Sequence, residues 1–118
     1  LARRIARGPR WAILNPNTRI CVTNTPLCPR AAFALCNVAR IRADSTVLDP
    51  FAGSCATLLA AAMIDPTTKT VGIEIAHDGL VCRDDIRKDF STRNLTQPVA
   101  LLLGDASNCT IRAQARIN

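Results

Sequence analysis

Hydrophobic residues are most concentrated at 45–64, where two apolar runs flank a glycine turn. The first run, 45–49, has the length of a buried strand, and the second, 55–64, has the length of a helix. A β-branched run at 70–75 and a leucine-rich run at 99–103 predict two more strands. Strand, helix and strand in this order form a crossover unit. The pattern therefore predicts an α/β domain with a mostly parallel sheet.

Further helices are predicted on both sides of this unit. Apolar positions surround most of segment 30–39, which follows two prolines and predicts a helix buried against the sheet. Segment 78–93 predicts an amphipathic helix whose apolar face carries Cys82, Ile86 and Phe90. We expect a short strand at 11–14, a turn at 15–18, and a three-layer α/β half-sheet as the overall arrangement.

Length and charge limit what the chain can be. Its 118 residues suffice for one small domain, and a hydrophobic content of 48% provides a core. We expect a basic lead-in at 1–10, cut from a longer chain, and a partial domain at 11–118. The net charge is +6. Eight arginines precede Asp44, which is the first acidic residue in the sequence. This excess favours RNA as a partner, or else a solvated arginine face. No apolar run approaches the length of a membrane span, so we expect no membrane association.

The six cysteines are widely spaced, without a C-x-x-C pair or a second histidine. This spacing favours neither a metal site nor a disulfide framework, and no metal is expected. Most of these cysteines are expected to be reduced and buried, as in an intracellular, cytoplasmic protein. For Cys55 a second interpretation is a nucleophile, although no base stands near it in the sequence.

Candidate chemistry lies where the predicted strands end. Asp49 ends the first strand, and the missing side chain of Gly53 lets backbone amides at a helix N-terminus approach a ligand. A dinucleotide fingerprint needs three glycines here, so NAD is not expected. Glu74 ends the second strand. Its separation from Asp49 in the sequence is close to that at which a nucleotide-binding fold presents an acid, which accepts hydrogen bonds from two ribose hydroxyls. Asp105 follows the third strand, so three acids meet at one sheet edge.

These residues resemble a known family. Residues 49–54, Asp-Pro-Phe-Ala-Gly-Ser, are similar to the D-P-F-x-G-[ST]-G motif of class I S-adenosylmethionine-dependent methyltransferases. The resemblance is greatest to RNA guanosine methyltransferases that carry a THUMP domain. It extends over about residues 11–107 and includes Gly104-Asp105-Ala106. The family has glycine at the position of Cys55, so here a side chain stands beside the ligand's methionine end.

The resemblance implies a Rossmann-like fold, of which this chain is the N-terminal cofactor-binding half, and S-adenosylmethionine as the cofactor. Thr25 would lie over the methionine tail, although the local sequence favours a helix cap. Ile75 would lie against the adenine, and Asp105 would accept from its amino group. The implied cofactor-binding residues are Thr25, Asp49, Phe51, Gly53, Ser54, Glu74, Ile75, Asp105 and Ala106.

The family's Asn/Asp-Pro-Pro-aromatic motif, which holds the target base, does not occur after Asp105 in this sequence. No catalytic residue is therefore assigned, and we expect this fragment alone to be inactive. The resemblance implies methyl transfer to an exocyclic guanine nitrogen of tRNA or rRNA, with an activating partner protein as a further expectation. The alternative is a non-catalytic cofactor- or RNA-binding module, or a subunit of a methyltransferase complex.

Overall fold

A three-stranded parallel sheet forms the centre of the computed structural model, which describes residues 8, 10–75 and 79–108. The strands are β1 (Thr46–Asp49), β2 (Lys69–Glu74) and β3 (Ala100–Leu103), in the order β1-β2-β3. Asp49 pairs with Gly72 and Glu74 pairs with Leu103 in the register, so the strands end near one another. The predicted parallel α/β sheet is confirmed.

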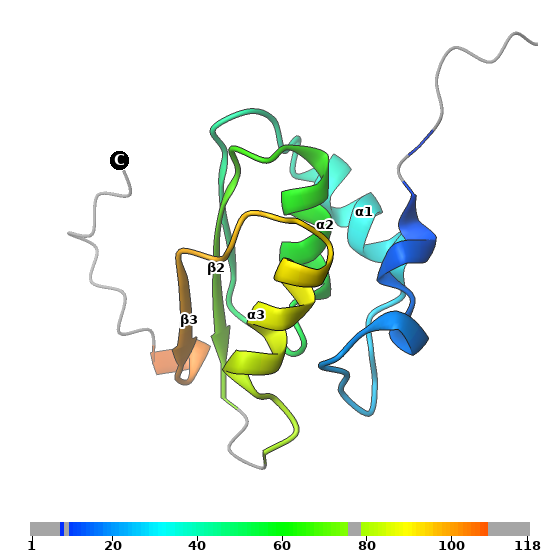
Figure 1. Ribbon diagram of the computed structural model, residues 1–118. Coiled ribbons are helices and arrows are strands. Elements are labelled where there is room, and N and C mark those ends of the chain that lie inside the picture. The colour runs from blue at the N-terminus through cyan, green and yellow to red at the C-terminus, as the bar shows by residue number, and fades with distance from the viewer. Residues whose placement is uncertain (1–7, 9, 76–78, 109–118) are drawn as a thin grey trace, which may run out of the picture.

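The helices cover one side of this sheet (Figure 1). They are α1 (Pro29–Val38), α2 (Ala56–Ile64) and α3 (Arg83–Thr92). Helix α2 is apolar around its whole circumference and lies between the sheet and α1. Its residues from Leu58 to Ala62 are at most 2% exposed, so α2 is the centre of the hydrophobic core.

A glycine allows α2 to lie this close to the sheet. A Cβ atom at Gly72 would lie 2.9 Å from the Cβ of Ala52 and 3.0 Å from Leu58 Cδ1. The first distance is shorter than a Cβ atom tolerates, and the second would require Leu58 to shift by a few tenths of an ångström. The absence of a side chain at Gly72 thus sets the spacing between β2, α2 and the turn that joins β1 to α2.

The predicted strand at 11–14 is wrong. Trp11–Leu14 forms a 3-10 helix, η1, and Pro16–Thr18 forms a second, η2, at the predicted turn. Only Leu14 of η1 is buried, so the segment contributes one side chain to the core and no strand pairing. Asn15 supports η2 because its side chain accepts a 3.1 Å hydrogen bond from the Asn17 N–H.

Two helix predictions need correction. Helix α3 begins at Arg83, because Gly79 has a left-handed φ of 77° and Cys82 is extended. The other part of the predicted start, 76–78, lies outside the described residues. Helix α1 begins with Pro29 at its first position, but it packs against α2 and η1 rather than directly on the sheet.

The predicted third layer does not occur among the described residues, whose helices lie on a single side of the sheet (Figure 1). Two leucines of the sheet, Leu48 and Leu102, remain exposed, at 42% and 40%. The expected lead-in falls mostly outside the described residues, as does segment 109–118. Over the described residues, each helix is too short or too polar to cross a bilayer. These same residues contain no group of His, Cys, Asp and Glu able to hold a metal ion.

Candidate functional site

The candidate site is built on the turn after β1, residues 50–55, which we call the Gly53 turn. The Ala52 N–H donates to the Ile73 carbonyl at 2.8 Å, which ties the turn to β2. Gly53 has a φ of 49°, a conformation that glycine adopts without steric cost. Its N–H donates to Glu74 Oε2 at 2.6 Å. The turn and the acid that ends β2 are therefore in direct contact.

Asp49 shapes the start of the same turn. Its Oδ1 accepts from the Phe51 N–H at 3.0 Å, and its Oδ2 accepts from the Thr57 hydroxyl in α2. Each oxygen thus has a partner within the protein, while a carboxylate retains further lone pairs for a ligand. Asp49 consequently joins the end of β1 to the first turns of α2.

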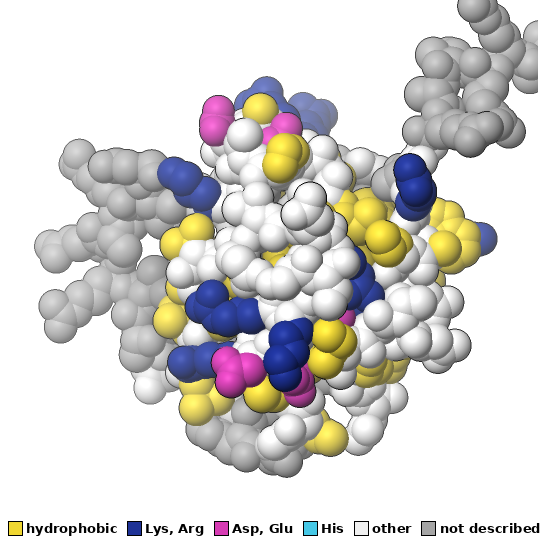
Figure 2. Space-filling model, in the orientation of Figure 1, with side chains coloured by type: hydrophobic (Ala, Val, Ile, Leu, Met, Phe, Trp, Pro, Cys, Tyr) yellow, Lys and Arg dark blue, Asp and Glu magenta, His cyan; other side chains and the backbone are white. Residues whose placement is uncertain are grey.

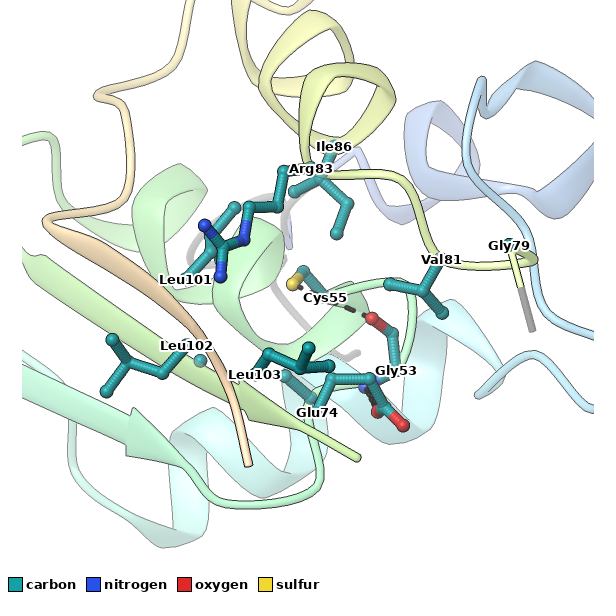
Figure 3. Close-up of a pocket in the computed structure, with 12 residues that line it drawn as sticks. Gly53, Cys55, Glu74, Gly79, Val81, Arg83, Ile86, Leu101, Leu102 and Leu103 are labelled. Atoms are coloured by element: carbon teal, nitrogen blue, oxygen red, sulfur yellow. Dashed lines mark hydrogen bonds between the residues drawn. The ribbon is translucent and has the colours of Figure 1, made fainter. Parts of the chain in front are cut away.

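Several cavities border the Gly53 turn, and three of them are lined by Gly53, by Glu74 or by both. The α3 cavity, about 310 Å³, is lined by residues that include Gly53, Cys55, Glu74, Arg83 and Ile86 (Figure 3). The Thr23 cavity, about 110 Å³, is lined by residues that include Thr23, Thr25, Asp49, Phe51, Gly53 and Ser54. The Asp105 cavity, about 150 Å³, is lined by Pro50, Phe51, Glu74, Ile75, Gly104, Asp105 and Ala106.

Every residue predicted to bind the cofactor lines at least one of these cavities. Glu74 and Asp105 share the Asp105 cavity, whereas Asp49 lines the Thr23 cavity. None of the three is lined by all three carboxylates, although Phe51 lines both the Thr23 cavity and the Asp105 cavity. The structure brings the predicted residues to one end of the sheet, on both sides of the Gly53 turn.

The end of β3 is tied to the end of β2. The Gly104 N–H donates to the Glu74 carbonyl at 2.9 Å. Asp105 is exposed, and its Oδ1 accepts from the Ser107 N–H at 2.8 Å and from the Ser107 hydroxyl at 2.7 Å. These two hydrogen bonds lower the pKa of Asp105. The Ser107 hydroxyl makes the larger contribution, and the Ser107 N–H makes the smaller one. The acid is therefore ionised at neutral pH and open to a donor from a ligand.

Thr25 and Cys55 each had two interpretations. Cys28 occupies the N-cap position of α1 without a side-chain cap bond, so the prediction that Thr25 caps this helix is wrong.

Cys55 is 1% exposed, and burial raises its pKa to about 12. A thiol with so high a pKa is protonated at neutral pH, so a nucleophilic role for Cys55 is not supported. Cys55 instead adopts a left-handed φ of 63° immediately before α2.

Cys21, Cys36 and Cys55 are buried, while Cys28 and Cys82 are exposed. All five have free thiols, and the sixth, Cys109, lies outside the described residues. The expectation of reduced cysteines is thus met for these five, and that of burial for three of them.

Sequence reasoning missed Arg19. Its side chain is 3% exposed, and its Nη2 donates to the carbonyl oxygen of Ser54 in the Gly53 turn. Asp89 on α3 makes this burial possible, because its Oδ2 lies 3.0 Å from Arg19 Nε and compensates the charge. One signal was available in the sequence, since Asp89 lies three residues after Ile86 and beside Phe90, on the side of α3 predicted to be apolar.

Comparison with known families agrees with this geometry. Residues 16–115, which are 100 of the 118 residues, match the family described as RMKL-like, methyltransferase domain. No curated protein matches the chain. The matched range contains β1, the Gly53 turn, β2 and β3 together with their three acids. The chain therefore belongs to the RMKL-like methyltransferase domain family.

Proposed function

We propose that this domain binds S-adenosylmethionine around the Gly53 turn and serves methyl transfer to an exocyclic guanine nitrogen of tRNA or rRNA in the cytoplasm. The observation that carries the proposal is the 2.6 Å hydrogen bond between the Gly53 N–H and Glu74 Oε2. It joins the glycine turn to the acid at the end of the neighbouring strand, where open parallel sheets bind nucleotides. Membership of a methyltransferase family supports the same reading.

The residues around the turn fit an adenosyl ligand. A Cβ atom at Gly53 would have no heavy atom closer than Thr23 Cγ2 at 3.8 Å and Glu74 Oε2 at 4.0 Å, so ligand atoms have room beside the backbone. The carboxylate of Glu74 suits vicinal ribose hydroxyls, and the exposed side chain of Ile75 offers an apolar surface to a base. Asp105 lines the same cavity as these two residues.

When bound, S-adenosylmethionine supplies a methyl group on a sulfonium centre. The protein's part is to orient it: Glu74 accepts hydrogen bonds from the sugar, Asp49 attracts the amino group, and Asp105 accepts from the base. Correct orientation alone removes a large share of the barrier to in-line displacement. We assign no acid or base catalyst among the described residues.

The basic residues support RNA as the substrate class. Arg10, Arg30, Arg40 and Arg42 have exposed side chains, whereas Arg19 is buried in an ion pair and is not available to RNA. Over α3, cations and acids are interspersed (Figure 2), so this face offers no continuous basic patch. We therefore place RNA contacts on the exposed arginines of the first third, with an activating protein as a further proposed partner.

The test uses the full-length natural protein and calorimetric titration with S-adenosylmethionine. Glu74→Gln retains an oxygen that can accept from the Gly53 N–H but loses the charge, and we expect its Kd to rise at least tenfold. Asp44→Asn changes an exposed acid that precedes the N-terminal end of β1, at the opposite end of this strand from the turn; it is the matched control and should bind like the wild type. Unchanged binding by Glu74→Gln would show that the cofactor site is misassigned.

The second step of the test is transfer of a labelled methyl group to purified tRNA and rRNA, followed by nucleoside mapping. Methylated guanosine is the expected product. Cofactor binding without methyl transfer to either RNA would instead support the alternative of a non-catalytic cofactor- or RNA-binding module.

A further inference from the structure

A buried carboxylate on α3 organises the segment that precedes α1. Asp89 is fully buried and accepts hydrogen bonds from the N–H groups of Ile20 at 2.8 Å and Cys21 at 3.0 Å. It also accepts from Arg19 Nε at 3.0 Å and from Arg93 Nη1 at 2.8 Å. A buried charge needs such compensation to be tolerated, and here the donors come from far apart in the sequence.

Arg19 links Asp89 to the Gly53 turn. Its guanidinium is a rigid fork, so the nitrogen that bonds Asp89 determines where the others point. One of these, Nη2, donates to the Ser54 carbonyl. That carbonyl belongs to the Ser54–Cys55 peptide, whose N–H donates to the Ala52 carbonyl at 2.6 Å. Both polar groups of a single peptide in the turn are therefore held.

The held peptide leads into a strained residue. Cys55 has a left-handed φ of 63°, a conformation that is unfavourable for a residue with a side chain. Such a conformation persists only where its surroundings determine it. The contact from Arg19 to the preceding carbonyl is one such determinant, and Gly53, whose N–H faces Glu74, is two residues away.

The same network positions the wall opposite the turn. Backbone N–H groups of Ile20 and Cys21 are anchored on Asp89, and the chain then passes Thr23 and Thr25, which line the Thr23 cavity. Asp89 thus fixes two sides of one cavity: the turn through Arg19, and the segment at 23–25 through the backbone.

We propose that Arg19 is a positioning residue for cofactor binding, which acts through the Ser54 carbonyl and holds the Gly53 turn in its binding conformation. The inference rests on the proposed function, since it concerns the same cavities. Arg19 does not touch the cofactor in this proposal.

Arg93 provides a matched control. Its side chain is 6% exposed, it also pairs with Asp89, and its Nη2 donates to the Thr18 carbonyl at 2.6 Å. Its Nε donates to the Ile13 carbonyl at 3.1 Å. Arg19 and Arg93 therefore share burial, charge and the carboxylate, but the bonds of Arg93 go to η1 and η2 rather than to the Gly53 turn.

The experiment compares Arg19→Lys with Arg93→Lys in the full-length natural protein. Both variants keep the charge and lose the fork, so both should lower the melting temperature by similar amounts. We expect Arg19→Lys to raise the Kd for S-adenosylhomocysteine at least tenfold, and Arg93→Lys less than threefold. Equal changes in Kd would overturn the inference, because binding would then follow overall stability. No change in either variant would also overturn it, because binding would then not depend on Arg19.

A second readout needs no ligand. The Cys55 N–H should exchange with solvent at least tenfold faster in ligand-free Arg19→Lys, and at the wild-type rate in Arg93→Lys. If the wild type fails to bind S-adenosylhomocysteine, the proposed function is wrong, and this exchange rate alone decides whether Arg19 positions the turn. If Arg19→Lys does not fold, Arg19→Gln and Arg93→Gln form the substitute pair, with the same expected difference in exchange.

Discussion

The Gly53 turn has two unlike sides. Toward α3 it is held by polar groups: Arg19 bonds the Ser54 carbonyl, and Asp89 fixes Arg19. On the other side lies a groove of about 340 Å³, the α1 groove, whose partly exposed apolar walls include Leu35, Leu48 and Phe51. The contacts of Arg19 and Asp89 are buried, charged and paired, whereas the α1 groove is open and apolar.

The difference teaches how each side tolerates change. A buried ion pair has strict geometry, so loss of one partner leaves a desolvated charge without compensation. A side chain in an apolar wall that still contacts water contributes little to the stability of the fold, because much of its surface remains exposed in the folded state. Substitutions on the α3 side should therefore cost far more stability than substitutions in the α1 groove.

The largest effect is expected for Asp89→Ala. The change leaves Arg19 and Arg93 buried without their carboxylate, and the free energy of unfolding should fall by about 3–5 kcal/mol. Urea denaturation followed by circular dichroism measures it. Asp85→Ala on the same helix removes an exposed pair with Lys88 and should leave the urea midpoint unchanged. Similar losses for both variants would contradict the view that burial makes the α3 side rigid.

A smaller loss is expected for Gly72→Ala, beneath the turn. The new methyl group would press on Ala52 and Leu58, and overpacking of this kind costs about 1–3 kcal/mol. Gly104→Ala is the control, since its added Cβ would meet Ile73 Cγ2 at an ordinary 3.8 Å. Thermal unfolding of the two variants should separate them, and equal midpoints would mean that the sheet and α2 move apart easily.

Local sequence predicted the part of the fold that apolar runs determine. Three strands, α2 and the juxtaposition of Gly53 with Glu74 follow from strand lengths, one glycine and the position of an acid at a strand end. The predicted strand at 11–14 was wrong because four apolar residues fit a 3-10 turn equally well. Only tertiary contacts decide between them: Leu14 packs into the core, and no strand lies beside the segment among the described residues.

The charge network was missed for a different reason. An aspartate and two arginines normally belong to a solvated surface. The position of Asp89 on the apolar side of α3 was a local signal, but a separation such as 19 to 89 does not identify its partners. Burial makes them a unit, and burial depends on how α3 meets the segment before α1. The sequence thus predicted which strand ends lie together, but not the buried residues that hold the Gly53 turn in place.

The stability of the fold should depend on pH through the buried carboxyl of Asp89. Burial raises the pKa of Asp89, but its two backbone donors and the Arg19 guanidinium outweigh this effect and hold the pKa below its ordinary value. A lowered folded-state pKa stabilises the protein above the unfolded-state value of about 4, and this stabilisation is lost as the pH falls through the folded-state pKa. The free energy of unfolding should therefore decrease with falling pH in this acid range.

Asp89→Asn isolates the contribution of this group. The exposed carboxyls of Asp65 and Asp105 also have lowered pKa values, but they are present in both proteins and cancel in the difference. Urea titrations between pH 5 and pH 2 should give a flatter profile for the variant. Parallel profiles would show that Asp89 does not titrate with folding in this range.

The smallest effect is expected in the α1 groove. Leu35 on α1 is half exposed, so Leu35→Gln should change the free energy of unfolding by only about 0.5 kcal/mol. Phe33 lies on the same helix but is 5% exposed, and Phe33→Ala should cost about 3–5 kcal/mol. The two variants, compared by urea denaturation, separate the open wall from the packed face of one helix. A loss for Leu35→Gln as large as that for Phe33→Ala would mean that the groove is closed in solution by a contact absent from this structure.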